Sequence, residues 1–291
     1  MNILETAKKT RGRAIIAFAL MLCLHAGAVT GCTENKTPDT DDSWGASSDS
    51  LQSETATAEN TESEDDYLIN GFDVRTISDY PEIEAAIRQS LNAETGELTN
   101  LTKEDFLSVT SLDIYDADIE DITPLKALIN LTDLYVAKTG VADLSPISEL
   151  ENLTILFLIN NEIVDVSPLS DLENLSQLDL DSNNISELSP LSGLTNLYWL
   201  SLERNEIVDV FPLAGLNVTD LRLCSNKLSD ITPLGELKKI QRLCFSFNPV
   251  NDISALRNAT TLLQLYAVNC PIDDFSPVDH VICLESSTVC R

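Results

Sequence analysis

Leucines recur along residues 112–265 at a constant interval of 22 residues, broken by a single interval of 21. The repeated pattern, in one-letter code, is L-x-x-L-x-L-x-x-N-x-I-x-D-x-x-P-L, and its fourth position is always leucine. These leucines are Leu112, Leu134, Leu156, Leu178, Leu200, Leu221, Leu243 and Leu265. A fixed period of this length predicts a solenoid, in which each unit packs against its two neighbours.

Each repeat divides into a strand and a turn. The segment L-x-x-L-x-L alternates with period two, which predicts a short strand with its leucines on one face and its third, fifth and seventh positions on the other. The second half of most repeats contains a pair such as Ser189-Pro190. This pair predicts a hydroxyl cap followed by a short 3₁₀ turn. An acidic residue recurs two positions earlier, and we interpret that column as turn capping in preference to calcium binding.

The ninth position of the central repeats is asparagine. These residues are Asn161, Asn183, Asn205, Asn226 and Asn248. The chain must turn away from the sheet here, and buried peptide groups without a partner are costly. An asparagine amide both donates and accepts hydrogen bonds. The pattern therefore predicts a buried asparagine ladder that joins neighbouring repeats, and not a set of ligand-binding residues.

The pattern resembles the leucine-rich repeat family, in the 22-residue class typified by bacterial internalins and the regulatory protein SDS22. The resemblance covers residues 109–281, about eight units, with departures at Ala117, Thr139, Ala255 and Cys270. It implies an α/β solenoid of horseshoe shape, with a parallel β-sheet on the concave side and short 3₁₀ or extended segments on the convex side. Residues 67–108 contain the helical pattern YPEIEAAIRQSLN and resemble the N-terminal cap of such proteins, while residues 282–291 are predicted to cap the other end.

Residues 1–31 are predicted to be an export signal. Basic residues precede the apolar run AIIAFALMLCL, which is too short to span a bilayer, and small residues follow it. The segment from Val29 to Cys32 resembles the bacterial lipobox, which implies that Cys32 carries a lipid. A plain secretory signal and an uncleaved anchor are the alternatives. Residues 32–66 are acidic and poor in apolar side chains, which predicts a disordered tether.

The chain is strongly acidic, with 47 acidic and 18 basic residues and a formal net charge of −29 at pH 7. This charge argues against nucleic acid as a partner, because nucleic-acid binding depends on Lys and Arg that neutralise phosphate. It favours a protein ligand of basic or mixed charge. The sequence has no Gly-rich phosphate loop, HExxH motif or spaced zinc ligands, so it predicts no enzyme, no cofactor and no metal site.

Proteins that this chain resembles bind other macromolecules on the concave face of the sheet. The strand positions that point away from the core therefore supply the candidate binding residues, which are Tyr115, Tyr135, Ile155, Phe157, Ile159, Trp199, Arg222 and Arg242. The apolar members are predicted to form a contiguous exposed patch, which is typical of interface hot spots. The alternative is that these solvent positions simply tolerate aromatic residues.

Cysteine usage fits an oxidising compartment. The favoured disulfide joins Cys283 and Cys290 near the C-terminus, with Cys270 as a competing partner. Cys224 and Cys244 fall on neighbouring strands but two positions out of step, so a bond between them is predicted to be strained and at least one of them to be free.

These features together predict a lipid-anchored binding module of the bacterial cell envelope, of adhesion or scaffold type, at the outer membrane or cell surface. A passive spacer or coat component of the envelope is the alternative.

Overall fold

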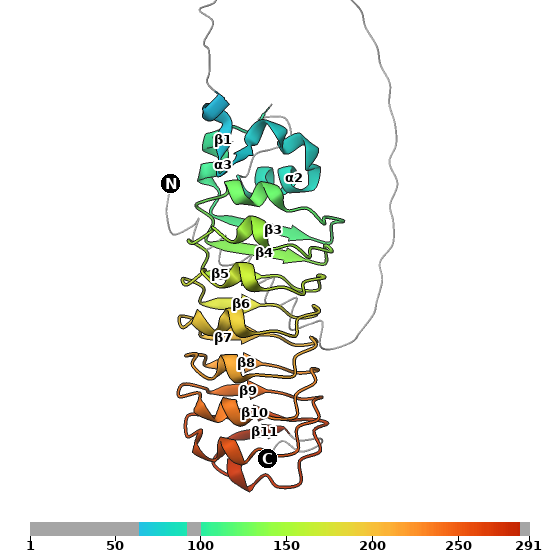
Figure 1. The fold of residues 1–291 in the computed structure, drawn as a ribbon, viewed down its shortest axis with the longest axis vertical. Coiled ribbons are helices and arrows are strands. Elements are labelled where there is room, and N and C mark those ends of the chain that lie inside the picture. Colours follow the sequence, from blue (N-terminus) through green and yellow to red (C-terminus); the bar gives the residue numbers. More distant parts are fainter. Residues whose placement is uncertain (1–63, 92–99, 286–291) are drawn as a thin grey trace, which may run out of the picture. The chain divides into compact units, whose positions relative to one another are not determined.

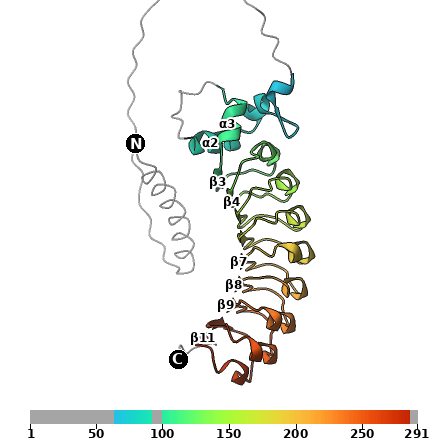
Figure 2. The ribbon, with the colours of Figure 1, turned by 90° about the vertical axis from the view of Figure 1, so that its left-hand side faces the viewer.

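The computed structural model describes residues 64–91 and 100–285, which form a stack of repeats with strands on one side and 3₁₀ turns on the other (Figures 1 and 2). Nine strands make one sheet in chain order, from β3 to β11. Their bounds are β3 (Ser111–Tyr115), β4 (Asp133–Ala137), β5 (Ile155–Phe157), β6 (Gln177–Asp179), β7 (Trp199–Ser201), β8 (Asp220–Arg222), β9 (Arg242–Cys244), β10 (Gln264–Tyr266) and β11 (Cys283–Glu285).

All neighbouring strands of this sheet pair in parallel and in the register of the repeat. Leu178 lies opposite Leu200, for example, and Leu200 lies opposite Leu221. The single shorter repeat is therefore absorbed outside the strands. A slip of one residue would turn each leucine to the opposite face of the sheet, and these leucines are fully buried. The predicted parallel sheet and solenoid are confirmed.

The opposite side of the stack consists of short 3₁₀ segments. They are η3 (Thr123–Ala127), η4 (Ser145–Ile147), η5 (Ser167–Leu169), η6 (Ser189–Gly193), η7 (Phe211–Leu213), η8 (Thr232–Glu236), η9 (Ser254–Asn258) and η10 (Ser276–Val278). Each repeat thus contributes one strand and one 3₁₀ segment. Short turns of this kind suit the few residues that remain between one strand and the next.

The prediction that Ser and Thr hydroxyls cap these turns is wrong. The acidic residue two positions earlier is the capping group, because the Ser145 backbone N–H donates to Asp143 Oδ1 at 2.8 Å. The Ser145 hydroxyl donates to the same carboxylate, to Oδ2 at 2.9 Å. The contact recurs at Asp165, where hydrogen bonds from Ser167 lower the pKa of the carboxyl group. The acidic column thus has a structural role, as the sequence indicated, but the hydroxyls are donors to it.

The N-terminal end of the sheet is covered by a small cap. The cap comprises η1 (Glu64–Tyr67), the hairpin of β1 (Leu68–Ile69) and β2 (Phe72–Asp73), η2 (Val74–Asp79), α2 (Pro81–Ser90) and α3 (Lys103–Ser108). Helix α2 lies along strand β3, and the Ser90 hydroxyl donates to the Ser111 carbonyl at 2.7 Å. A capping box between Thr102 and Asp105 begins α3. The cap therefore protects an edge strand that would otherwise expose unpaired peptide groups.

At the C-terminal end, strand β11 pairs with β10 and adds a last strand to the parallel sheet. Residues 282–291 were predicted to form a closing cap, and residues 286–291 of that segment lie outside the described residues. Among the described residues, no helix has both the length and the apolar character needed to cross a membrane.

Each of the eight repeats contains one residue in the left-handed backbone conformation at its eighth position, one or three residues after the strand ends. Their φ angles lie between 54° and 61°, and the residues are Asp116, Lys138, Asn160, Ser182, Arg204, Ser225, Phe247 and Asn269. This conformation turns the chain out of the sheet toward the ninth position. It is unfavourable for bulky side chains, and the sequence pattern did not predict it because the position varies from repeat to repeat.

Candidate functional site

The ninth-position asparagines lie inside the stack, one above another. The Asn183 Nδ2 donates to the Leu158 carbonyl at 2.8 Å and to the Leu180 carbonyl at 3.0 Å, while its Oδ1 accepts from the Ile163 N–H at 3.1 Å. Asn205 makes the same set of contacts one repeat further on. These side chains therefore pair the peptide groups of the turn with those of the preceding repeat, and they do not face the concave surface.

Two residues continue this column where asparagine is absent. The Thr139 hydroxyl donates to Asn161 Oδ1 at 2.7 Å, and the Cys270 Sγ lies 3.3 Å from the Phe245 carbonyl. Burial raises the pKa of the Cys270 thiol. Both residues occupy the ninth position, and they make fewer hydrogen bonds there than the asparagines do.

Three aromatic rings form a row across the concave face. The rings of Tyr135 and Phe157 meet edge to face with centroids 5.1 Å apart, and the centroids of Phe157 and Trp199 are 5.4 Å apart. The Arg222 guanidinium continues the row, 5.4 Å from the centre of the Trp199 ring. We call these four residues the aromatic row. Phe157 and Trp199 come from β5 and β7, so their rings lean toward each other over strand β6.

The prediction of a contiguous exposed apolar patch is wrong in part. Phe157 and Trp199 are only 8% and 6% exposed, because each covers the other. Tyr135, Ile155 and Ile159 are half-buried. Tyr115 is 59% exposed, and it lies beside Lys138, whose Nζ donates to the Tyr115 hydroxyl at 2.6 Å. The rings are thus already packed in the free protein. A ligand can contact the edges of the rings more readily than their faces.

Three carboxylates lie together next to the aromatic row, one on strand β6 and the others two residues beyond the ends of β6 and β7. Asp179 is completely buried, and its Oδ1 accepts from the Asp181 N–H at 3.0 Å. Its Oδ2 has no hydrogen-bond partner among the described residues. Asp181 Oδ1 accepts from the Ser201 hydroxyl at 2.6 Å and from the Glu203 N–H at 2.7 Å. We call Asp179, Asp181 and Glu203 the carboxylate cluster.

Burial and mutual repulsion dominate the electrostatics of the carboxylate cluster. Burial, followed by the charge of Asp181, raises the pKa of Asp179 well above its ordinary value. Burial, followed by the charge of Glu203, raises the pKa of Asp181 to about 6. Burial also raises the pKa of Tyr135 to about 12, with a smaller contribution from Asp133. The concave face therefore carries acidic groups that are held in an unfavourable environment.

The two candidate arginines share one acidic partner that the sequence analysis did not single out. Asp220 accepts from Arg222 at 3.3 Å and from Arg242 through its other oxygen. Arg242 also donates to Gln264 Oε1 at 2.6 Å. Asp220, Arg242 and Gln264 line a hollow of about 290 Å³ together with Tyr198 and Trp199. Asp220 could have been identified from its phase, because it is directly opposite Arg242 in the register.

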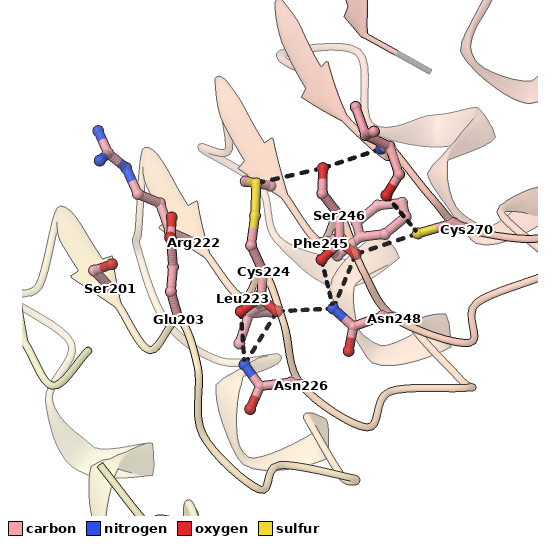
Figure 3. The surroundings of a disulfide bond; sticks show 12 residues. Ser201, Glu203, Arg222, Leu223, Cys224, Asn226, Phe245, Ser246, Asn248 and Cys270 are labelled. Atoms are coloured by element: carbon pink, nitrogen blue, oxygen red, sulfur yellow. Dashed lines mark hydrogen bonds between the residues drawn. A yellow bond between two sulfur atoms is a disulfide. The ribbon is translucent and has the colours of Figure 1, made fainter. Parts of the chain in front are cut away.

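Cys224 and Cys244 form a disulfide, with 5.8 Å between their Cα atoms (Figure 3). The prediction that at least one of them is free is therefore wrong. Hydrogen bonds of parallel strands are slanted, and the Leu223 N–H donates to the Cys244 carbonyl, which brings the two cysteines within disulfide range despite the offset. Among the described residues, Cys283 has no disulfide partner. Its predicted partner Cys290 lies outside the described residues, as do the signal residues 1–31 and the lipidation candidate Cys32.

Comparisons with known proteins support the repeat assignment. A family model described as "Leucine Rich repeats (2 copies)" matches residues 151–193. A search of curated protein sequences finds no match. The structure is similar to an internalin C2 from Listeria monocytogenes, with a TM-score of 0.66 and 29% identity over 71% of this chain and 92% of that one.

The internalin inlF of the same organism gives a TM-score of 0.60 and 29% identity, covering 73% of this chain and 70% of the other. The ectodomain of the plant receptor kinase GASSHO1/SCHENGEN3 from Arabidopsis thaliana, solved in complex with CASPARIAN STRIP INTEGRITY FACTOR 2, shares the fold at a TM-score of 0.55 and 20% identity over 64% of this chain and 25% of that one. The fold is thus a leucine-rich repeat solenoid of internalin-like form, and proteins with this fold generally engage in protein–protein interaction.

Proposed function

We propose that this protein is an envelope-bound binding module that recognises a protein ligand on its concave face. The observation that carries the proposal is the aromatic row, which crosses β4 to β8 with its rings already packed. Tyr, Trp and Arg are the residues in which interface binding energy concentrates. Because these side chains are ordered before the ligand arrives, little of their conformational entropy is lost on binding.

The charge of the face favours a ligand of basic or mixed charge. The carboxylate cluster borders the aromatic row on one side, while both nearby arginines are already paired with Asp220. A ligand therefore meets the partly exposed carboxylates of Asp181 and Glu203 next to apolar ring edges. Association with such a surface is accelerated by opposite charge on the ligand and weakened by salt.

Half-buried Ile155 allows a direct test, because it lies on the concave face without belonging to the aromatic row. An Ile155→Asp variant places a charge at the centre of the proposed interface. The matched control is Val208→Asp, since Val208 is 57% exposed and lies outside the strands. Both variants and the wild type are used to capture proteins from envelope extracts and from candidate host extracts. We expect a partner that binds the wild type and Val208→Asp but not Ile155→Asp.

Equal loss in the two variants, or equal retention, would contradict a concave-face interface. A passive spacer is the second candidate function, and it predicts that no protein saturates this face at all. Circular dichroism of each variant establishes that the fold is unchanged.

The membrane attachment is a separate part of the proposal. Cys32 is the proposed lipidation site, and residues 33–66 would hold the repeats away from the membrane surface. Cells that express the wild type or Cys32→Ser are labelled with a clickable fatty acid and then fractionated. We expect the label and the membrane association to be lost in Cys32→Ser. Surface exposure is tested separately, by protease treatment of intact cells, which degrades a protein exposed at the cell surface. A labelled Cys32→Ser variant would refute this anchor.

A further inference from the structure

Three side chains that can bind a metal ion lie together beside the disulfide. They are Glu203, Cys224 and Cys244, and one carboxylate oxygen and the two Sγ atoms all lie within 4.8 Å of one another. Figure 3 shows Glu203 and Cys224 at the ends of neighbouring strands, next to the sulfur–sulfur bond. Among residues 64–91 and 100–285, no other group of three such residues is as close.

The backbone holds these residues in place independently of the disulfide. The Leu223 N–H donates to the Cys244 carbonyl at 2.7 Å, and the Arg204 N–H donates to the Cys224 carbonyl at 2.8 Å. The Glu203 N–H donates to Asp181 at 2.7 Å. Because these bonds belong to the parallel sheet and its margin, we expect the three Cα positions to persist when the disulfide is reduced.

We propose that the reduced protein binds one Zn²⁺ through Cys224, Cys244 and Glu203, and that the disulfide is the metal-free form of the same site. A dithiol reductant opens the site: the sulfur–sulfur bond breaks, both cysteines gain a proton, and the dithiol becomes a disulfide. Zinc then displaces two thiol protons into solvent and forms two Zn–S bonds and one Zn–O bond. A water molecule occupies the fourth position.

The ligand chemistry selects zinc over calcium or magnesium. Thiolates are soft ligands that suit zinc, whereas calcium and magnesium require oxygen. Tetrahedral zinc with Zn–S bonds of about 2.3 Å needs its two sulfurs about 3.7 Å apart, a separation that rotation of two side chains on fixed Cα atoms 5.8 Å apart can supply. Two thiolates and one carboxylate sum to −3, which the ion reduces to −1.

Arg222 and Cys270, two residues near the site, make their own contacts elsewhere. Arg222 is directed away from the sulfurs, because it pairs with Asp220 and lies over the Trp199 ring. Cys270 belongs to the asparagine column, where its thiol contacts the Phe245 carbonyl. The zinc site is thus a property of the concave face, and it does not depend on the identity of the protein ligand.

The test is zinc binding to the full-length chain, measured by competition with a chromogenic chelator in anaerobic buffer. We expect the reduced wild type to bind one zinc per chain and the oxidised wild type to bind none at this site. Cys224→Ser and Cys244→Ser should each lose the site. Glu203→Gln should weaken zinc binding at least 10-fold, in line with the usual effect of disturbing a metal site. Glu206→Gln is the matched control, because Glu206 is exposed and pairs with Lys227.

Cobalt supplies a second readout, since a thiolate-to-cobalt charge-transfer band reports sulfur ligation directly. The band should persist in Cys270→Ser and Cys283→Ser, which excludes the other described cysteines. Zinc binding of equal strength by the oxidised protein or by Cys224→Ser would overturn the proposal. So would unchanged affinity in Glu203→Gln, a variant that keeps both cysteines and therefore remains informative if a cysteine variant fails to fold.

Discussion

The asparagine column predicts a large and local loss of stability when one amide is removed. In Asn183→Ala, the buried Ile163 N–H loses its acceptor, and the carbonyls of Leu158 and Leu180 each lose a donor. An unpaired buried N–H costs about 1–3 kcal/mol, and each lost hydrogen bond costs about 0.5–1.5 kcal/mol. Together these effects lower the free energy of unfolding by about 2–6 kcal/mol. Urea-induced unfolding followed by circular dichroism measures this difference.

Asn196→Ala is the matched control at the end of the same repeat. Asn196 is exposed and makes one hydrogen bond, from Nδ2 to the Glu173 carbonyl at 2.9 Å. Its removal should cost no more than about 1 kcal/mol. If the two variants were equally stable, the buried peptide groups would not need the amide, and the explanation of the ninth position would be refuted. Amide hydrogen exchange should also accelerate first at Ile163 in Asn183→Ala.

Three further predictions concern pH, backbone strain and close packing. Burial and the charge of Glu203 raise the pKa of Asp181 from 3.8 to about 6 in the folded protein, so stability should fall as pH rises from about 4 to about 6. Thermal unfolding across that pH range should show this fall in the wild type and a smaller one in Asp181→Asn. Phe247 has φ of 61° and is 55% exposed, so Phe247→Asn should stabilise the protein by about 1 kcal/mol, and an unchanged urea midpoint would contradict the strain. A Cβ at Gly235 would lie 2.5 Å from the Ala255 carbonyl oxygen, so Gly235→Ala should destabilise by about 1–3 kcal/mol, whereas Gly215→Ala, with open space around it, should lose less than about 0.5 kcal/mol in the same unfolding assay.

The features that the sequence predicted correctly are those decided by local pattern. The period of 22 residues fixes both strand position and register, because the fourth-position leucine must face the core in every unit. The acidic column likewise predicted a structural role in the turns. The identity of the donor was missed, since Ser145 can cap through its hydroxyl or be capped through its N–H, and only the geometry of the turn decides between them.

The features that the sequence did not predict depend on how side chains lean across the sheet. Positions three and five of each strand point away from the core, which suggested exposure, but the rings of Phe157 and Trp199 reach over an intervening strand and bury each other. The offset between Cys224 and Cys244 suggested separation, but it is overcome by the slant of parallel hydrogen bonds. The position of a residue along a strand predicts which face of the sheet its side chain is on. It does not predict contacts between side chains of alternate strands.

The aromatic row and the carboxylate cluster should be thermodynamically coupled. Burial is the largest cause of the raised pKa of Asp179, and the rings that lean over β6 are the groups positioned to exclude water from it. Trp199→Ala should therefore lower the pKa of Asp179 and flatten the dependence of stability on pH, although no carboxylate is changed. Tyr198→Ala is the control, because Tyr198 is next to Trp199 in the sequence and is 46% exposed. This variant should leave the dependence of stability on pH intact. If the stability of Trp199→Ala depended on pH as steeply as that of the wild type, the ring would not control the hydration of Asp179. A ligand that covers the rings would then leave the charge of the carboxylate cluster unaffected.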